Sequence, residues 1–351
     1  MISVILPVRN AIATIARAVA SVQRQTLGAW ELVVVDDGST DGTREWLHEA
    51  ARGEPRLRLI EQRALGLVAA LNTGLAAARG ELIARLDADD ECHPERFAAQ
   101  AEFLMAQPAI GLVSSLVGFG GDETANAGYA LHVGWLNSLV TPEQIALNRF
   151  VESPLAHPSV MFRRELVERH GGYRAGDFPE DYELWLRWLD AGVNMAKVPR
   201  ELLIWHDTPG RLSRTDPRYE PDAFFRVKAG YVARWLAKNA GRDHSIASVA
   251  EPGAKVPRPQ EIWIWGAGRQ TRKRAALLAP HGVSIAGYID VDVKKIGQRV
   301  GGLPVIGPEE LPPPGRIFVL GYVSKRGARE YNQAELARRG YVEGRDYLMC
   351  A

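Results

Sequence analysis

Apolar and polar positions follow a regular order over the first third of the chain. Short apolar runs of strand length alternate with longer segments that have helical periodicity. The run "SVILPV" precedes a segment in which Ile12, Ile15, Ala16, Val19 and Val22 share one helical face. The runs "ELVVVDDG", "RLRLIEQ" and "ELIARLDADD" are each followed by a further helical segment. This order predicts an α/β fold with a mostly parallel sheet that helices cover on both faces.

The pattern changes at two places farther along the chain. From Gly118 to about Phe150 the sequence is rich in Gly and Asn, and no element can be assigned. Strand and helix patterns then return, until a stretch around residues 241–260 that contains several Pro and Gly residues and lacks periodicity. A second, smaller α/β pattern follows that stretch. We therefore predict an N-terminal domain at 1–240, a linker at 241–260 and a small Rossmann-like domain at 261–351.

Composition excludes several classes of protein. With 43 Lys and Arg against 42 Asp and Glu, the net charge of +1 indicates no nucleic-acid partner. Two cysteines cannot build a disulfide framework. The N-terminus "MISVILPVRN" lacks the features of a signal peptide, and no apolar run reaches the roughly 18–20 residues that span a bilayer. We expect a cytoplasmic protein without a transmembrane segment, for which peripheral membrane contact stays open.

Two acidic turns follow apolar strands in the N-terminal part. Asp87, Asp89 and Asp90 come directly after one strand, and Asp36 and Asp37 end another. Ligands of parallel sheets bind at the carboxyl ends of the strands, where both turns are expected. Carboxylates this close raise one another's pKa unless a cation neutralises them, and Mn²⁺ or Mg²⁺ prefers such oxygen ligands. The alternative is that these residues form ordinary Asp-rich turns that begin helices.

Several segments together resemble family 2 glycosyltransferases of the GT-A fold. They are "ISVILPVRNAIATIARAVASVQRQT", "ELVVVDDGSTDGT", "AALNTGLAAARGELIARLDADD", "HPSVMFRRELVERHGGYR" and "EDYELWLRW", in the order typical of that family. The resemblance covers about residues 1–238. It implies an inverting transferase that moves a sugar from a nucleotide-diphosphate sugar, most often a UDP-sugar, in polysaccharide or cell-wall biosynthesis. The implied acceptor is a hydroxyl of a glycan, a lipid-linked molecule or a small molecule, and the implied cofactor is Mn²⁺ or Mg²⁺.

The resemblance also assigns the donor site by position. The residues it places at the nucleotide, base and ribose are Pro7, Val8, Asn10 and Asp36 or Asp37. Asp87 and Asp89 would form the D-x-D pair that holds the cation, with Asp89 as the more direct ligand. A bound cation would stabilise the charge on the leaving nucleotide diphosphate.

The segment "GDFPEDYELWLRW" offers the base that an attacking hydroxyl needs. The resemblance favours Asp181 as this base, with Glu180 as a neighbouring acceptor-binding group or base. Both acids also suit a helix N-terminus, where negative charge is favourable. Trp185 lies one helical turn after Asp181 and is a candidate for stacking on the acceptor sugar, with a place in the core as the alternative.

The segment "ELLIWHDTPGRLSR" departs from the family pattern, in which Arg and then His commonly precede Pro-Gly. Here His206 stands at the usual Arg position and Thr208 at the usual His position. His206 is a candidate ligand of the metal or diphosphate, and Arg211 a candidate phosphate ligand. His157, in "LAHPSVMF", resembles a recurrent position near the active centre. For both histidines a structural role is the alternative.

The C-terminal part contains a Gly-x-Gly turn between a strand and a helix. Gly266 and Gly268 form the turn, and Asp290 ends the next strand, as in dinucleotide-binding sites. Thr271 replaces the third glycine of that motif, so we expect an accessory domain without a bound cofactor. Two alternatives to a transferase are a nicotinamide-dependent oxidoreductase centred on this turn and a non-catalytic module that binds nucleotide sugars or glycans.

Overall fold

The computed structural model describes residues 1–121, 126–208, 210–239, 261–325 and 327–351, so the predicted linker at 241–260 lies outside the described residues. The chain divides into two compact units. Unit 1 comprises Met1–Ala146 and Ser153–Tyr219, and unit 2 comprises Leu147–Glu152 and Glu220–Ala351. The helix Pro221–Asn239, which the predicted boundaries place in the N-terminal domain, belongs to unit 2 in this division.

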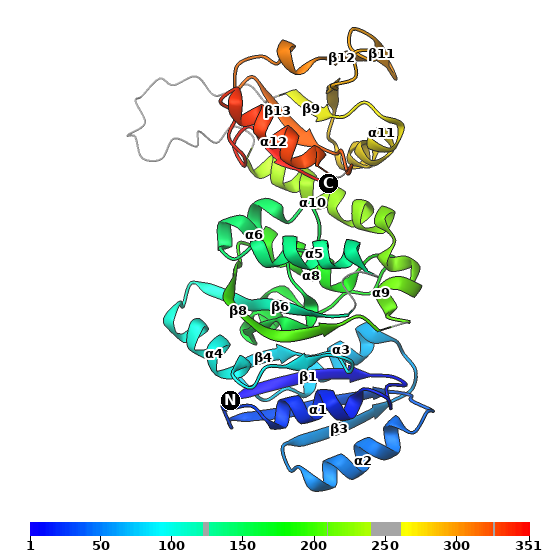
Figure 1. Cartoon of the computed structure of the whole chain (residues 1–351), viewed down its shortest axis with the longest axis vertical. Coiled ribbons are helices and arrows are strands. Elements are labelled where there is room, and N and C mark those ends of the chain that lie inside the picture. The colour runs from blue at the N-terminus through cyan, green and yellow to red at the C-terminus, as the bar shows by residue number, and fades with distance from the viewer. Residues whose placement is uncertain (122–125, 209, 240–260, 326) are drawn as a thin grey trace. The chain divides into compact units, whose positions relative to one another are not determined.

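Unit 1 is built on an eight-stranded sheet with the order β3-β2-β1-β4-β7-β6-β8-β5 (Figure 1). Strands β1 to β4 are mutually parallel, and β6 is parallel to β8. Strand β7 is antiparallel to β4 and β6, and β5 is antiparallel to β8. The carboxyl ends of β2, β1 and β4 therefore meet at one edge. The strands are β1 Ile2–Val8, β2 Trp30–Asp37, β3 Leu57–Gln62, β4 Leu82–Arg85, β5 Glu91–Cys92, β6 Ile110–Gly120, β7 Met161–Arg163 and β8 Asn194–His206.

Helices cover both faces of this sheet. Successive residues of a strand point to opposite faces, and in β1 apolar residues occur on both, so each face needs a covering layer. Val4 and Leu6 of β1 belong to one core with Ile15, whereas Ile5 belongs to a second core with Leu71 and other residues. The helices of unit 1 are α1 Ile15–Gln23, α2 Thr43–Gly53, α3 Leu67–Ala77, α4 Arg96–Ala106, α5 Ala127–Ser138, α6 Pro142–Asn148 (which continues into unit 2), α7 Glu165–His170, α8 Glu180–Asp190 and α9 Leu212–Thr215.

Two local predictions are corrected by this structure. Ile12 and Ala16 are exposed, because α1 begins only at Ile15 and its buried face includes Ala18 instead. The described parts of the unassigned stretch from Gly118 to Phe150 hold the end of β6 and two helices, α5 and α6. Residues 122–125 within that stretch lie outside the described residues. The helix α5 thus brings side chains to unit 1 that the sequence pattern did not place.

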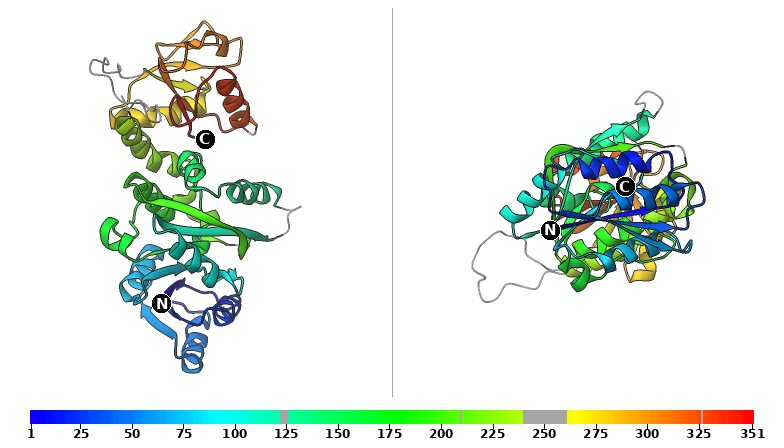
Figure 2. Two further views of the ribbon diagram at one scale, coloured as in Figure 1. Left: turned by 90° about the vertical axis from the view of Figure 1, so that its left-hand side faces the viewer. Right: turned by 90° about the horizontal axis from the view of Figure 1, so that it is seen from below.

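Unit 2 contains a six-stranded sheet with the order β11-β12-β10-β9-β13-β14, in the part coloured yellow to red in the left view of Figure 2. The buried amine of Lys228 donates hydrogen bonds to the carbonyl oxygens of Phe150 (2.7 Å), Val151 (3.2 Å) and Cys350 (2.6 Å). These bonds tie three segments of unit 2 together. Its elements are α10 Pro221–Asn239, β9 Glu261–Trp265, α11 Arg269–Ala275, β10 Ile285–Ile289, β11 Arg299–Val300, β12 Leu303–Ile306, β13 Ile317–Gly321, α12 Ala328–Arg338 and β14 Tyr347–Met349. Across the described ranges, no helix combines the length and apolarity needed to cross a bilayer.

Candidate active site

Three carboxylates converge directly after β4. One oxygen from each of Asp87, Asp89 and Asp90 lies within 4.8 Å of the others, and we call this group the acid triad. Asp90 is fully buried, and its Oδ1 accepts a hydrogen bond from the backbone N–H of His206 (2.9 Å). The Oδ2 atom of Asp90 has no hydrogen-bond partner among the described residues. A buried carboxylate oxygen without a partner is costly unless a ligand meets it.

The electrostatics of the acid triad favour a cation. Burial, followed by the negative charge of Asp87, raises the pKa of Asp89 above its ordinary value. Burial and then the charges of Asp87 and Asp89 raise the pKa of Asp90 much further. These residues fit a hard divalent cation, because such ions take oxygen ligands and would neutralise this repulsion. Thr208 donates a hydrogen bond from Oγ1 to Asp89 Oδ2 (2.8 Å).

Arg85, the last residue of β4, is a buried cation beside the acid triad. It forms an ion pair with Asp87 through Nη1. The positive charge of Arg85 also lowers the pKa of Tyr173 and of Asp181, although burial raises both more strongly. Arg85 therefore acts electrostatically on the triad and on the acidic pair at the start of α8.

That second acidic pair is Glu180 and Asp181. Glu180 is buried, and its Oε2 accepts a hydrogen bond from the Tyr219 hydroxyl (2.7 Å). Burial raises the pKa of Glu180. Burial, and then the charge of Glu180, raises the pKa of Asp181 to about 7, while its side chain stays partly exposed. A carboxylate with a pKa near the working pH is well suited to accept a proton during a reaction.

The predicted nucleotide residues at the end of β1 lie beside the turn that follows β2. Pro7 and Val8 are buried in the strand, and Asn10 is the one non-glycine residue with positive φ (51°) in the described part of the chain. The backbone N–H of Asn10 donates to Ser39 Oγ (2.9 Å), and its Oδ1 accepts from the Thr40 N–H (2.8 Å). Asn10 thus joins the two turns, while its contact with a nucleotide stays a prediction.

Asp36 and Asp37 both find partners within the protein. Asp36 Oδ2 pairs with Arg44 Nε (2.9 Å), and its Oδ1 accepts from a nearby backbone N–H. Asp37 accepts from Gln62 Nε2 (2.7 Å) and from two backbone N–H groups of the loop before α3. These bonds give both acids a role in shaping the turns, and a contact of either with base or ribose remains a prediction.

His206 lies near the acid triad without belonging to the group of convergent oxygens. Its Nε2 is 4.0 Å from Glu91 Oε2. Burial, followed by the charge of Arg17, lowers the pKa of His206, so the ring is neutral near pH 7. A Cβ atom at Gly120 would lie 2.7 Å from His206 Nδ1, so only glycine leaves room for the ring there. Its role as a metal ligand stays a prediction.

Arg211 is partly buried in the segment before α9. It donates a hydrogen bond from Nη1 to the Tyr129 hydroxyl (2.6 Å), and its guanidinium lies 4.9 Å from the centroid of the Trp205 ring. The charges of Asp90, Asp87 and Asp89 contribute to a raised pKa of Arg211, against the opposing effect of its burial. The structure therefore brings the predicted phosphate ligand and the acid triad within electrostatic reach of one another.

Comparisons with known proteins agree with this geometry. Residues 3–171 match the profile described as Glycosyl transferase family 2. The chain is 30% identical over 197 residues to an uncharacterized glycosyltransferase of Haemophilus influenzae, in an alignment that covers 55% of this chain and 70% of that protein.

The chain belongs to glycosyl transferase family 2.

Further similarities extend this family membership. The chain is 27% identical over 190 residues to UDP-Gal:alpha-D-GlcNAc-diphosphoundecaprenol beta-1,3-galactosyltransferase of Escherichia coli, covering 54% of this chain and 67% of that protein. It spans about two thirds of the length of the curated relatives it matches. The crystal structure of S. aureus TarS 1-349 in complex with UDP-GlcNAc aligns with a TM-score of 0.54 at 19% identity, over 67% of this chain and 66% of that one. That likeness shows the fold and confirms the predicted GT-A type architecture of this family member.

For this glycosyl transferase family 2 chain, the prediction that Trp185 binds the acceptor is wrong. Its side chain is fully buried, with the ring against His157 and Trp188, because this face of α8 packs into the second core. No face of the ring is open to a sugar. His157 is also buried, with Nε2 2.7 Å from the Tyr173 hydroxyl, and burial lowers its pKa well below the ordinary value. A contact of His157 with the donor stays a prediction.

Some residues of the site in this family member were missed by the sequence reasoning. Arg85 had one visible signal, since it is a basic residue inside the apolar run "ELIARL". Tyr219 and Tyr129 had none, because each meets its partner only through the fold, across 39 and 82 positions of sequence. Asp90 belongs to the acidic turn, but the resemblance assigns it no metal-ligand role, although it is the most buried of the three acids.

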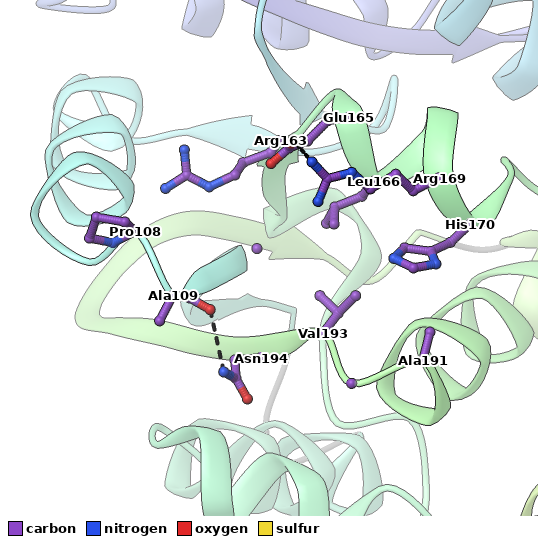
Figure 3. Close-up of a pocket in the computed structure, with 12 residues that line it drawn as sticks. Pro108, Ala109, Arg163, Glu165, Leu166, Arg169, His170, Ala191, Val193 and Asn194 are labelled. Carbon is purple, nitrogen blue, oxygen red and sulfur yellow. Dashed lines mark hydrogen bonds and ion pairs between the residues drawn. The ribbon is translucent and has the colours of Figure 1, made fainter.

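A separate cavity of about 210 Å³ lies at the amino ends of β6 and β8, lined by Arg163, Leu166, Arg169, His170 and other residues (Figure 3). Strand β6 runs in the same direction as β4, since both are antiparallel to β7. The cavity is therefore at the opposite edge of the sheet from the acid triad. None of the predicted site residues lines it, and it adds nothing to the site of this family member.

Proposed function

We propose that this chain is an inverting glycosyltransferase that transfers a sugar from a nucleotide-diphosphate sugar to a hydroxyl group, assisted by Mn²⁺ or Mg²⁺. The observation that carries the proposal is the unpartnered, buried Oδ2 of Asp90 within the acid triad. Family membership supports the reaction class. The E. coli relative, whose name gives a UDP-Gal donor and a diphosphoundecaprenol acceptor, supports a UDP-sugar and a lipid-linked acceptor, with glycans and small molecules as the other acceptor classes.

Different residues of this chain would bind the cation and the diphosphate of the donor. Asp89, Asp87 and Asp90 would hold the cation, and Thr208 and the His206 N–H orient two of these carboxylates. A bound cation would stabilise the negative charge that develops on the leaving nucleotide diphosphate. Arg211 would bind the diphosphate, since guanidinium matches the geometry of phosphate oxygens.

Asp181 is the proposed base. The oxygen of the acceptor hydroxyl forms a bond to the anomeric carbon while the bond from that carbon to the diphosphate breaks. The hydroxyl proton passes to the carboxylate of Asp181, and the electron pair of the broken bond leaves with the diphosphate. A single displacement of this kind inverts the configuration at the anomeric carbon. Because the family profile ends at residue 171, this assignment rests on the position and pKa of Asp181 and on the motif resemblance.

A donor screen tests this function. We expect one UDP- or GDP-sugar to raise the melting temperature in the presence of Mn²⁺, because a ligand that binds the folded state stabilises it. Release of UDP or GDP should then accompany transfer to an acceptor. A rise with NAD(P) and none with any nucleotide sugar would favour the oxidoreductase instead. Donor binding without transfer to any acceptor class or to water would favour a non-catalytic binding module.

A further inference from the structure

The guanidinium of Arg211 stacks on Trp205, the residue before His206, whose backbone N–H donates to Asp90. Arg211 thus lies within electrostatic reach of the acid triad but does not pair with it among the described residues. The three carboxylates act on the pKa of Arg211, yet within the described residues none of them forms an ion pair with it inside 4.0 Å. Among the described residues, the guanidinium donates one hydrogen bond, from Nη1 to the hydroxyl of Tyr129. An arginine has five N–H donors, so the others are left for a ligand. Arg211 and the acid triad are not paired with one another. A ligand that contains both a metal cation and an anionic diphosphate would therefore meet both groups, with the cation at the acid triad and the diphosphate at Arg211.

Tyr129 and Trp205 hold Arg211 in this position from two different elements. Tyr129 belongs to α5, and Trp205 lies near the end of β8. The guanidinium is 5.5 Å from the Tyr129 ring centroid and 4.9 Å from the Trp205 ring centroid, and the two rings are 5.2 Å apart. Phe119 of β6 supports Tyr129 from another side, with ring centroids 5.4 Å apart. These contacts restrict a long side chain that would otherwise sample many rotamers.

We propose that Tyr129 is a positioning residue whose hydroxyl keeps Arg211 turned toward the donor diphosphate and away from the carboxylates of the acid triad. This inference rests on the proposed function. Without the hydroxyl, the guanidinium is free to move onto Asp89 or Asp90, which would compete with the cation and withdraw the N–H groups from phosphate. A preorganised arginine binds its ligand more tightly, because less freedom is lost on binding.

A double-mutant cycle tests the proposal by calorimetric titration of UDP and of GDP with Mn²⁺ present. Tyr129→Phe keeps the ring and removes the hydroxyl, and we expect about threefold to tenfold weaker nucleotide binding, typical of one lost hydrogen bond. Arg211→Ala should weaken binding more. In the Arg211→Ala background, Tyr129→Phe should have no further effect, since its role passes through Arg211. Tyr331→Phe, at an exposed tyrosine of unit 2, is the matched control and should bind as the wild type does.

Different outcomes separate this inference from the proposed function. The positioning role is overturned if Tyr129→Phe binds nucleotide as the wild type does. It is also overturned if Tyr129→Phe loses the same affinity in the wild-type and Arg211→Ala backgrounds. The proposed function stands in both cases. A wild-type protein that binds neither UDP nor GDP overturns the proposed function and the inference with it. If Tyr129→Phe lowers the melting temperature, a loss of binding could come from instability alone. The effect of Tyr129→Phe is then measured in an Arg211→Lys background as a second test. Lysine keeps the charge but not the planar fork, so Tyr129→Phe should cost less in that background than in the wild type.

Discussion

Each unit of the chain has a buried aspartate just beyond a strand, and the two aspartates differ in their partners. Asp90 of unit 1 has one oxygen bonded and the other unpartnered. Asp290 of unit 2 follows β10 and has both oxygens occupied. Its Oδ1 accepts from the Asp292 N–H (3.0 Å), and its Oδ2 accepts from the Ala267 N–H (2.8 Å) and from Lys295 Nζ (3.1 Å).

The pKa values of the two aspartates shift in opposite directions for this reason. Burial raises the pKa of Asp90, and neighbouring carboxylates add to the effect. Burial also acts on Asp290, but hydrogen bonds from Asp292, Ala267 and Lys295 outweigh it and lower the pKa. An acid whose burial is not compensated by the protein indicates a functional site, whereas a satisfied acid indicates a structural one.

The same comparison explains the Gly-x-Gly turn of unit 2. The Ala267 N–H, a backbone donor within this turn, donates to Asp290. Gly266 has φ of 108°, and a Cβ atom there would lie 2.6 Å from Val323 Cγ2, so packing requires the glycine. The glycine and this hydrogen bond thus have a role in packing the turn, and the oxidoreductase alternative is not favoured.

The largest expected effect is that of Asp181→Asn. The amide keeps the size of the side chain but cannot take the acceptor proton, so the transfer rate should fall by about 10²–10⁴, the usual contribution of a positioned base. Donor affinity should survive, because the proposed role of Asp181 concerns only the acceptor. Transfer rate, donor affinity and melting temperature are measured on one preparation. Asp177→Asn, at an exposed aspartate shortly before α8, is the control. A folded Asp181→Asn with wild-type turnover would remove Asp181 from the base role.

The next effect is that of Asp89→Asn on donor binding. Loss of one carboxylate from the acid triad should weaken Mn²⁺-dependent binding of the nucleotide sugar tenfold or more, about 1.4 kcal/mol. Calorimetry with and without Mn²⁺ measures the change. Unchanged affinity in the presence of Mn²⁺ would show that Asp89 is not a metal ligand.

A smaller effect is expected on the pH dependence of transfer. Asp181 must be ionised to accept a proton, so kcat/KM should rise with pH through about 7, the pKa to which burial and Glu180 raise this carboxyl. In Glu180→Gln a neighbouring negative charge is removed, which favours ionisation of Asp181, so the midpoint should move to lower pH. Glutamine still accepts the Tyr219 hydrogen bond. A pH–rate profile with the same midpoint in both proteins speaks against the coupling of the two acids.

The smallest effect on transfer is expected for Asp290→Asn. This substitution removes charge-assisted hydrogen bonds from unit 2 and should lower the free energy of unfolding by about 1–3 kcal/mol. The transfer rate of the folded protein should stay that of the wild type, and NAD(P) should not change its melting temperature. A loss of donor affinity as large as that expected for Asp89→Asn would abolish the distinction between Asp290 and the acid triad.

Much of the fold could be predicted, because strand and helix periods were regular between Ile2 and Ala106. The helix α5 could not, since it contains Gly128 and Gly134 and lies in a stretch without clear periodicity. At the site, the acidic residues were visible because they cluster in sequence. Some of their partners were not visible, because Tyr219 meets Glu180, and Thr208 meets Asp89, only through the fold, across 39 and 119 positions of sequence.

The most direct test of the central claim is a crystal of the protein soaked with the UDP or GDP found to bind, together with Mn²⁺. Our account predicts an anomalous manganese signal among Asp87, Asp89 and Asp90, with the diphosphate bound between that signal and Arg211. The contrary result is a diphosphate bound at the Gly266–Gly268 turn of unit 2, or a nucleotide in unit 1 whose manganese lies away from all three carboxylates.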